Sequence, residues 1–149
     1  MVLGMGRIGT GAYDALRSRR GENVVGVDED EAKVNDHLQA GRRVIEADTT
    51  DYDFWMDVPL DKVEQIMLAL TNHAENTLVG KQLRDLGYGG KITAIVRFAE
   101  EGEELGQFGI ESFDLFTEAG RGFAEQAESS APPILAAPES DAATGTETG

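Results

Sequence analysis

A glycine-rich segment near the amino terminus has the pattern of a phosphate-binding loop. Gly4-Met5-Gly6-Arg7-Ile8-Gly9 is a complete G-x-G-x-x-G motif that directly follows a short apolar run. In such a loop Gly4 permits a tight turn, Gly6 lets a pyrophosphate approach the backbone, and Gly9 allows the following helix to pack closely on a sheet. Free N–H groups and the helix dipole then hold the phosphates. Arg7 either adds a charge-assisted contact or is an ordinary solvated arginine.

An acidic residue stands where such a site needs a ribose ligand. Asp28 lies 19 residues beyond Gly9, at the end of the apolar run Asn23–Val27. A carboxylate there accepts hydrogen bonds from the adenosine ribose hydroxyls. Glu29 and Asp30 follow, so a 2′-phosphate would meet like charges and no arginine. We therefore predict adenine dinucleotides or mononucleotides that lack this phosphate, and rejection of NADP. The alternative is that these acids only cap the next helix.

Polar residues also follow three later apolar runs. Asp48 closes the third run, where an adenine ring would lie. It either accepts from the adenine amino group or begins the turn into Thr49-Thr50-Asp51. Thr71 and Asn72 follow the fourth run, on the side of the sheet where ligands collect, and Asn72 is also a good helix N-cap. Arg97 ends the fifth run and would face the same cleft.

The elements that must position these residues alternate regularly over residues 1–127. Strands are predicted at Met1–Leu3, Asn23–Val27, Arg43–Glu46, Gln65–Leu70, Ile92–Val96 and near Ser112–Leu115. Helices are predicted at Arg7–Arg20, Asp30–Ala40, Tyr52–Met56, Ala74–Leu86, Phe98–Phe108 and near Glu118–Ala127. Gly21, Gly41 and Gly87 stand just past helix ends, where a left-handed residue is favoured. The pattern predicts an α/β fold, a Rossmann-like doubly wound parallel sheet with helices on both faces.

Composition limits what the chain can do. It has 28 acidic and 13 basic residues and a formal charge of −15, which disfavours binding to a phosphate backbone, so we expect no nucleic-acid partner. The absence of cysteine excludes disulfides and thiolate metal sites. The apolar runs are far shorter than the ~20 residues of a bilayer span, which favours a cytoplasmic location. Residues 128–149 are acidic, rich in proline and small residues, and predicted to be a disordered tail.

The residues of a catalytic centre are missing. The nucleotide fold uses essentially all of residues 1–127, and no Tyr-x-x-x-Lys motif occurs. His37 is expected on the surface of the second helix. His73 is expected in the first turn of the helix after the fourth strand, as a ligand contact or a neighbour of the helix cap. These two histidines have no helical partner for a metal site, so none is predicted. The sequence favours binding over catalysis.

Taken together, several segments resemble the RCK-type, or TrkA-N, regulatory nucleotide-binding domain, most closely the domain attached to Kef-type potassium/proton antiporters. They are Val2–Gly9, Asp28, Glu46–Asp51, Leu70–Asn72, Val96-Arg97 and Phe113–Ala124. The resemblance implies a cytoplasmic, dimeric gating module at the inner face of the membrane, not an enzyme. It would bind NAD(H), AMP or ATP and relay its ligand state to a membrane potassium transporter.

The resemblance also assigns roles to individual residues. The phosphates would be held by Gly4, Gly6, Arg7, Ile8 and Gly9, and the ribose by Asp28. The adenine would lie beside Asp48 and Thr49, and the cleft would be lined by Thr71, Asn72 and Arg97. The second regulatory lobe usual in the family is not apparent.

Two further expectations concern partners and the chain start. Phe113, Phe116, Ala119 and Phe123 either seal the sheet edge or pack across a dimer interface, and we favour the dimer. Only three residues precede Gly4, whereas strands usually have ~5–6. We therefore expect that the chain is the end of a longer polypeptide or has a misassigned start, and that upstream membrane helices are missing. One alternative function is a small NAD-dependent oxidoreductase without its catalytic half. Another is an interaction module that has lost its ligand, against which the intact glycines and Asp28 argue.

Overall fold

The computed structural model describes residues 1–130, in which six strands form one parallel sheet. The strands are β1 (Val2–Leu3), β2 (Gly26–Asp28), β3 (Val44–Glu46), β4 (Gln65–Leu68), β5 (Lys91–Val96) and β6 (Glu111–Asp114). Their spatial order is β3-β2-β1-β4-β5-β6, which is the order of dinucleotide-binding folds. The predicted doubly wound α/β fold is therefore confirmed.

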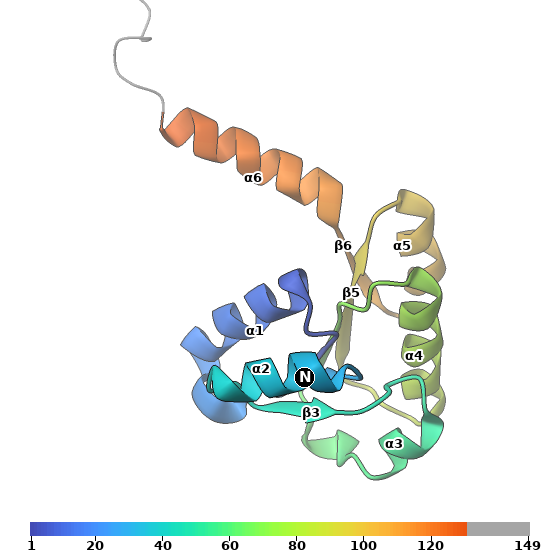
Figure 1. Ribbon diagram of the computed structural model, residues 1–149. Helices are drawn as coiled ribbons and strands as arrows, with labels where there is room; N and C mark the ends of the chain where they lie inside the picture. Colours follow the sequence, from blue (N-terminus) through green and yellow to red (C-terminus); the bar gives the residue numbers. More distant parts are fainter. Residues whose placement is uncertain (131–149) are drawn as a thin grey trace, which may run out of the picture. The chain divides into compact units, whose positions relative to one another are not determined.

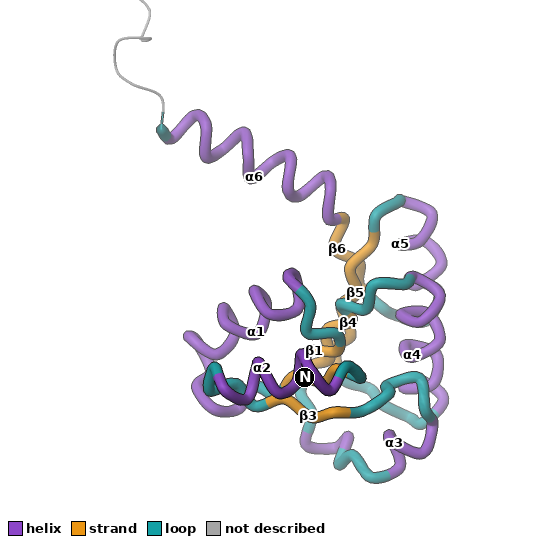
Figure 2. Tube along the Cα trace, viewed as in Figure 1, coloured by secondary structure: helices purple, strands orange, loops and turns teal. Residues whose placement is uncertain are grey.

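Helices connect successive strands and cover both faces of the sheet (Figures 1 and 2). They are α1 (Arg7–Arg20), α2 (Glu31–Gln39), α3 (Tyr52–Met56), α4 (His73–Asp85) and α5 (Ala99–Gly106), with short 3₁₀ turns at Gly21–Asn23 and Leu60–Lys62. A further helix, α6 (Leu115–Ser129), follows β6. Figure 1 shows α1 and α2 on one side of the sheet and α4 and α5 on the other. This arrangement follows from the right-handed crossovers that parallel strands require.

The core divides into two layers, one on each face of the sheet. Val2 points to the side of α1 and α2, where it packs with Met5, Tyr13, Val34 and other buried side chains. The next residue, Leu3, points to the opposite side and joins the larger cluster under α3, α4 and α5. Because successive side chains of a strand alternate in direction, one two-residue strand supplies both layers.

Several strand boundaries differ from the sequence prediction. The strand predicted at Asn23–Val27 is β2 at Gly26–Asp28, preceded by the 3₁₀ turn Gly21–Asn23. Its ladder with β1 consists of two residue pairs, because β1 offers partners only at Val2 and Leu3. The fourth strand ends at Leu68 rather than Leu70. Strand ends depend on what the neighbouring strand offers, which a local pattern does not encode.

The chain divides into a compact unit, Met1–Phe116, and the remainder, Thr117–Gly149. Helix α6 begins earlier than predicted, at Leu115, and continues through Ser129. Most of the predicted tail lies outside the described residues, and the division at residue 127 stays a prediction. No helix in residues 1–130 is long and apolar enough to cross a membrane.

Candidate functional site

The glycine loop joins β1 to α1 and is held by close backbone contacts. Gly4 has φ +89°, and a Cβ there would lie 2.5 Å from the carbonyl oxygen of Ala69. A Cβ on Gly9 would lie 1.7 Å from the carbonyl oxygen of Gly4. A Cβ on Gly6, by contrast, would meet no atom within 4 Å, and Gly6 is exposed. Two glycines thus allow the chain to fold tightly, while the third leaves open space at the loop surface.

The start of α1 faces this open space without a capping side chain. Gly6 is the N-cap residue, and among residues 1–130 no side chain caps this helix and no acid lies in its first turn. Arg7 and Ile8 are exposed. The first N–H groups of a helix have no intrahelical acceptor, and the helix dipole places partial positive charge there. An anionic group, such as the phosphate of a nucleotide, fits this helix start.

Asp28 ends β2 beside the glycine loop. Its Oδ2 accepts a hydrogen bond from the Met5 N–H at 2.8 Å, and its Oδ1 accepts one from the Asp30 N–H at 2.9 Å. These bonds fix the orientation of the carboxylate. Each oxygen retains a further lone pair, so the group can also accept from two vicinal hydroxyls. Asp30 in turn caps α2 by accepting from the Lys33 N–H at 3.2 Å, so the capping role belongs to Asp30 rather than Asp28.

A cleft of about 250 Å³ lies at the carboxyl ends of the central strands. Six of the residues singled out in the sequence line it: Gly4, Gly6, Asp28, Asp48, Thr49 and Thr71. Five do not: Arg7, Ile8, Gly9, Asn72 and Arg97. The lining contains five carboxylates, those of Asp28, Glu29, Asp30, Asp48 and Glu75, and one cationic side chain, Lys33. Sequence reasoning missed Lys33 and Glu75, which enter from the first turns of α2 and α4.

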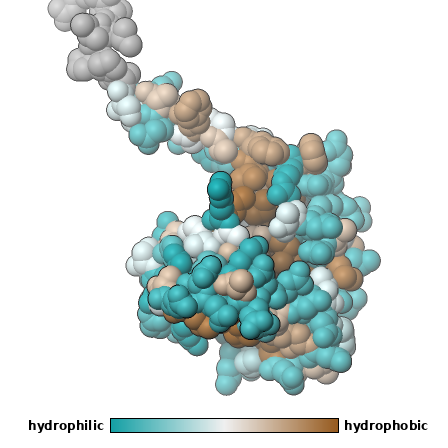
Figure 3. All heavy atoms as spheres, in the orientation of Figure 1, coloured by the Kyte–Doolittle hydropathy of each residue, from teal (hydrophilic) through white to brown (hydrophobic). Residues whose placement is uncertain are grey.

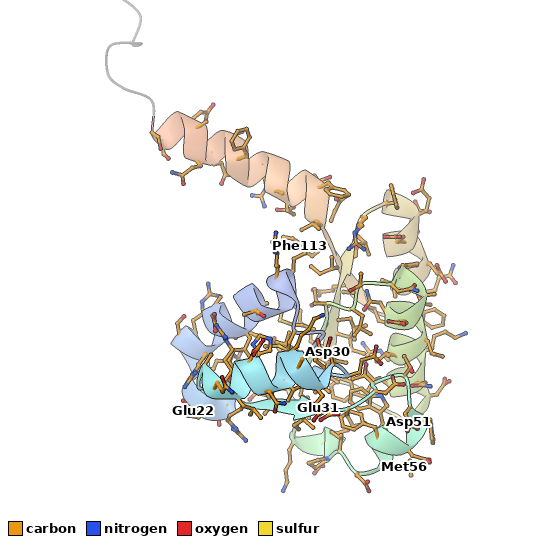
Figure 4. All side chains as sticks on the ribbon, viewed as in Figure 1. Glu22, Asp30, Glu31, Asp51, Met56 and Phe113 are labelled. Atoms are coloured by element: carbon orange, nitrogen blue, oxygen red, sulfur yellow. The ribbon has the colours of Figure 1, made fainter. Side chains whose placement is uncertain are left out.

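The acidic character of this region continues to its rim. Figure 4 shows Asp30 and Glu31 at the amino-terminal end of α2 and Asp51 at the start of α3. Hydrophilic side chains also cover the outward face of α2 (Figure 3). A ligand group carrying extra negative charge on this side of the cleft would therefore be repelled.

The wall formed after β3 is a hydrogen-bonded turn. The Oδ1 atom of Asp48 accepts from the Thr50 N–H at 2.9 Å and from the Thr50 hydroxyl at 2.6 Å. Asp48 therefore begins the turn, which was one of its two predicted roles, and it lines the cleft as well. The buried Trp55 indole N–H donates to the Thr49 carbonyl at 2.8 Å and anchors the turn to α3.

The opposite wall combines the ends of β4 and β5. Asn72 caps α4 by accepting from the Ala74 N–H at 2.8 Å, as predicted. The Arg97 guanidinium donates to the Thr71 carbonyl at 3.1 Å, so Arg97 supports the loop that lines the cleft. Its backbone N–H donates to the Glu101 carboxylate at 2.8 Å, which helps to hold the pKa of that carboxyl below its ordinary value.

The two histidines occupy different surroundings. The expectation that His37 lies on the surface is wrong: its ring is half-buried, with Nε2 2.8 Å from the Met5 carbonyl oxygen. The packing of α2 brings His37 to the glycine loop, 32 positions away in the sequence. The local sequence does not reveal this long-range contact. His73 pairs with Glu104, with 2.9 Å between Nε2 and the carboxylate, and does not line the cleft. Within residues 1–130 no cluster of three or more potential metal ligands occurs.

A larger hollow, about 990 Å³, lies at the other edge of the sheet, around the amino ends of the strands. Its lining mixes apolar side chains such as Leu16 and Phe54 with charged ones such as Arg20 and Glu64. Arg20 and Glu64 pair with each other at 2.6 Å. In open α/β sheets ligands bind at the carboxyl edge, so the smaller cleft at the glycine loop is the candidate site.

A family model described as the TrkA-N domain matches residues 1–113. This chain belongs to the TrkA-N domain family. A search of curated proteins gave no match. The TrkA-N assignment agrees with the sheet order and with the glycine loop at the β1–α1 junction.

Solved structures share this TrkA-N fold at low sequence identity. The NAD(P)-binding domain of an exopolyphosphatase-related protein from Archaeoglobus fulgidus superposes with a TM-score of 0.77 at 20% identity, covering 86% of this chain and 96% of that one. The Kef C-terminal domain of Shewanella denitrificans in its AMP-bound form has a TM-score of 0.71 at 14% identity, covering 86% and 78%. The GsuK channel bound to NAD has a TM-score of 0.70 at 22% identity, covering 81% of this chain and 22% of that one.

Proposed function

We propose that this TrkA-N chain is a regulatory domain that binds NAD(H), AMP or ATP and controls a potassium transport or potassium/proton antiport system. The observation that carries the proposal is the Asp28 carboxylate, which Met5 orients beside the uncapped start of α1. A ribose-binding acid and a phosphate-binding helix start thus share one cleft. The AMP-bound Kef domain and the NAD-bound GsuK channel, which have the same fold, support this choice of ligand.

The proposed ligand would extend across the carboxyl edge of the sheet. Its phosphates would lie on the loop from Gly4 to Gly9, where Arg7 at the mouth of α1 can approach them. Asp28 would accept from the ribose hydroxyls. The adenine would lie beside Asp48 and Thr49, and Thr71 would form the far wall. Behind that wall, Asn72 caps α4 and Arg97 donates to the Thr71 carbonyl.

The charge of the cleft favours a ligand without a 2′-phosphate. Glu29 and Asp30 directly follow the ribose-binding acid, and both line the cleft. Among residues 1–130 the lining contains one cationic side chain, Lys33, together with five carboxylates. A 2′-phosphate brings between one and two additional negative charges near neutral pH, so NADP should bind more weakly than NAD.

Nucleotide binding can be tested by thermal unfolding with NADH, AMP, ATP and NADPH in parallel. A ligand at 100 times its Kd adds ~2.7 kcal/mol, which corresponds to several degrees in Tm for a domain of this size. Asp28→Asn keeps a side-chain oxygen but removes the charge, and it should weaken NADH and AMP binding about tenfold. Asp36→Asn removes an exposed charge on α2, outside the cleft, and should leave affinity unchanged. No shift with any nucleotide would refute the proposal.

We infer that the site binds rather than transforms its ligand. NADH incubated with the protein and candidate carbonyl substrates should keep its absorbance. Protein-dependent oxidation of NADH would instead favour the oxidoreductase alternative.

We also propose that a second copy covers one face of α6. Phe116 and Phe123 are 60% and 78% exposed, and with Ala119 between them they follow helical spacing on one face. Figure 4 shows Phe113 at β6, just before this helix, and it is exposed too. Sedimentation should show a dimer that Phe116→Asp/Phe123→Asp dissociates. Met56→Asp, at another exposed apolar side chain, is the matched control. A monomeric wild type at tens of micromolar would contradict the dimer.

A regulatory signal requires that the nucleotide favour one state of the dimer. A full reversal between two states needs ~5.5 kcal/mol of differential binding, which two sites in a dimer would share. The dimer dissociation constant should therefore change when AMP or NADH saturates the protein. An unchanged dimer dissociation constant would show that a rearrangement of the dimer does not carry the signal to a membrane transporter at the cytoplasmic face.

A further inference from the structure

His37 reaches the glycine loop from α2, a contact that crosses 32 positions of the sequence. Its Nε2 lies 2.8 Å from the carbonyl oxygen of Met5, the second residue of the loop. The same carbonyl also accepts from the Thr10 hydroxyl at 3.1 Å. On its other side, the Met5 N–H donates to Asp28. Both polar groups of the Met5 backbone are therefore held by side chains from outside the loop turn.

The contacts of the two ring nitrogens favour one tautomer of His37. A carbonyl oxygen only accepts, so Nε2 carries a hydrogen and donates it to Met5. Nδ1 lies 3.4 Å from the Arg42 guanidinium, which only donates, so this contact also fits the tautomer with its hydrogen on Nε2. Arg42 is held in turn by two contacts to the Asp14 carboxylate, at 2.8 and 2.9 Å. Asp14, Arg42 and His37 thus form a row of side chains that ends at the Met5 carbonyl.

This contact fixes the direction of the next N–H group. All peptide bonds of the described chain are trans, so the Gly6 N–H points opposite to the Met5 carbonyl. Because His37 holds the Met5 carbonyl, it also fixes the direction of the Gly6 N–H, and Gly6 lines the cleft with open space around it. We propose that His37 is a positioning residue that aims the Gly6 N–H at the phosphate of the bound nucleotide. The inference rests on the proposed nucleotide function and adds a residue to it.

The test compares a ligand that has a phosphate with one that lacks it. Titration calorimetry, or NMR titration for weak ligands, gives Kd values for AMP and adenosine with wild type, His37→Leu and His37→Gln. His37→Leu removes the donor and should weaken AMP binding roughly three- to tenfold, while adenosine binding changes less than about twofold. His37→Gln retains an N–H donor at similar reach and should recover most of the AMP affinity. Asn35→Leu, at an exposed position of the same helix outside the cleft, should behave as wild type.

The outcomes separate this inference from the proposed function. Equal losses of AMP and adenosine binding would show a general structural role for His37 and overturn the inference, while the nucleotide site would stand. A wild type that binds neither AMP nor any other nucleotide would overturn both.

A second measurement leaves His37 unchanged, so it does not depend on whether a His37 variant folds. Long-range ¹H–¹⁵N spectra of the histidine rings, assigned with His73→Gln, report which nitrogen carries the hydrogen. We expect His37 of the free protein at neutral pH to be the neutral Nε2–H form. The neutral Nδ1–H form has no donor for the Met5 carbonyl and would overturn the inference.

Discussion

Gly9→Ala should lower the free energy of unfolding of this protein, whereas Gly11→Ala should not, although both glycines lie in α1. A Cβ on Gly9 would stand 1.7 Å from the Gly4 carbonyl oxygen, well inside van der Waals contact. Gly4 has no room to retreat, because a Cβ on it would itself lie 2.5 Å from the Ala69 carbonyl oxygen and its N–H donates to the Val27 carbonyl at 2.9 Å. A Cβ on Gly11, by contrast, would meet no atom within 4 Å.

The two substitutions should change the free energy of unfolding in opposite directions. Overpacking against an immobile backbone costs about 1–3 kcal/mol or more, so Gly9→Ala should lose at least that much. At Gly11 the same replacement removes backbone entropy of the unfolded chain and should add about 0.5–1 kcal/mol. The two variants should therefore differ by about 2 kcal/mol or more in the free energy of unfolding.

Urea denaturation followed by circular dichroism measures this difference. With a urea m-value of about 1–3 kcal/mol/M, the midpoints should be separated by about 1 M. Equal midpoints for Gly9→Ala and Gly11→Ala would refute the argument that the contact between loop and helix backbones requires glycine. An increase in stability for Gly9→Ala would refute the packing of α1 on β1 as described.

Three other positions separate ligand binding, acid stability and packing. Gly6→Ala should weaken AMP binding about tenfold or more, because its Cβ would occupy the open space of the loop. It should change the free energy of unfolding by no more than about 1 kcal/mol. Unchanged AMP affinity would contradict the candidate site. Backbone N–H donors at the start of α5 hold the pKa of Glu101 below its ordinary value of 4.5, so its stabilising effect is complete above that pH and is lost as the pH falls through the lowered pKa. Glu101→Gln should accordingly destabilise the protein at pH 7 and lose this deficit as the pH falls below 4.5, whereas Glu103→Gln, exposed on α5, should show no such pH dependence in urea denaturation. Trp55→Phe removes the hydrogen bond to the Thr49 carbonyl and leaves that buried oxygen unpaired, which should cost about 1–3 kcal/mol of unfolding free energy. A loss below about 0.5 kcal/mol would contradict this account.

Much of the fold was predictable because its signals are local. Helices α1 and α3 begin and end at the predicted residues, since the glycine loop and the Asp51 cap mark their starts. Gly21, Gly41 and Gly87 have positive φ, as expected for residues just past helix ends. The G-x-G-x-x-G pattern also located the loop, because its spacing between a strand and a helix is a local signal, as is the close contact between Gly9 and Gly4.

The sequence alone determined the alternation of strands and helices, the glycine loop and the polar residues at the strand ends, since these depend on short-range periodicity and turn chemistry. Only the tertiary structure decided which of those residues share a cleft, where strand β2 begins, and that Lys33 and Glu75 join the lining. It also decided that His37 contacts Met5 and that Arg97 supports Thr71 rather than lining the cleft. These contacts join residues 26 or more positions apart, and they exist only once the sheet register and the packing of the helices are set.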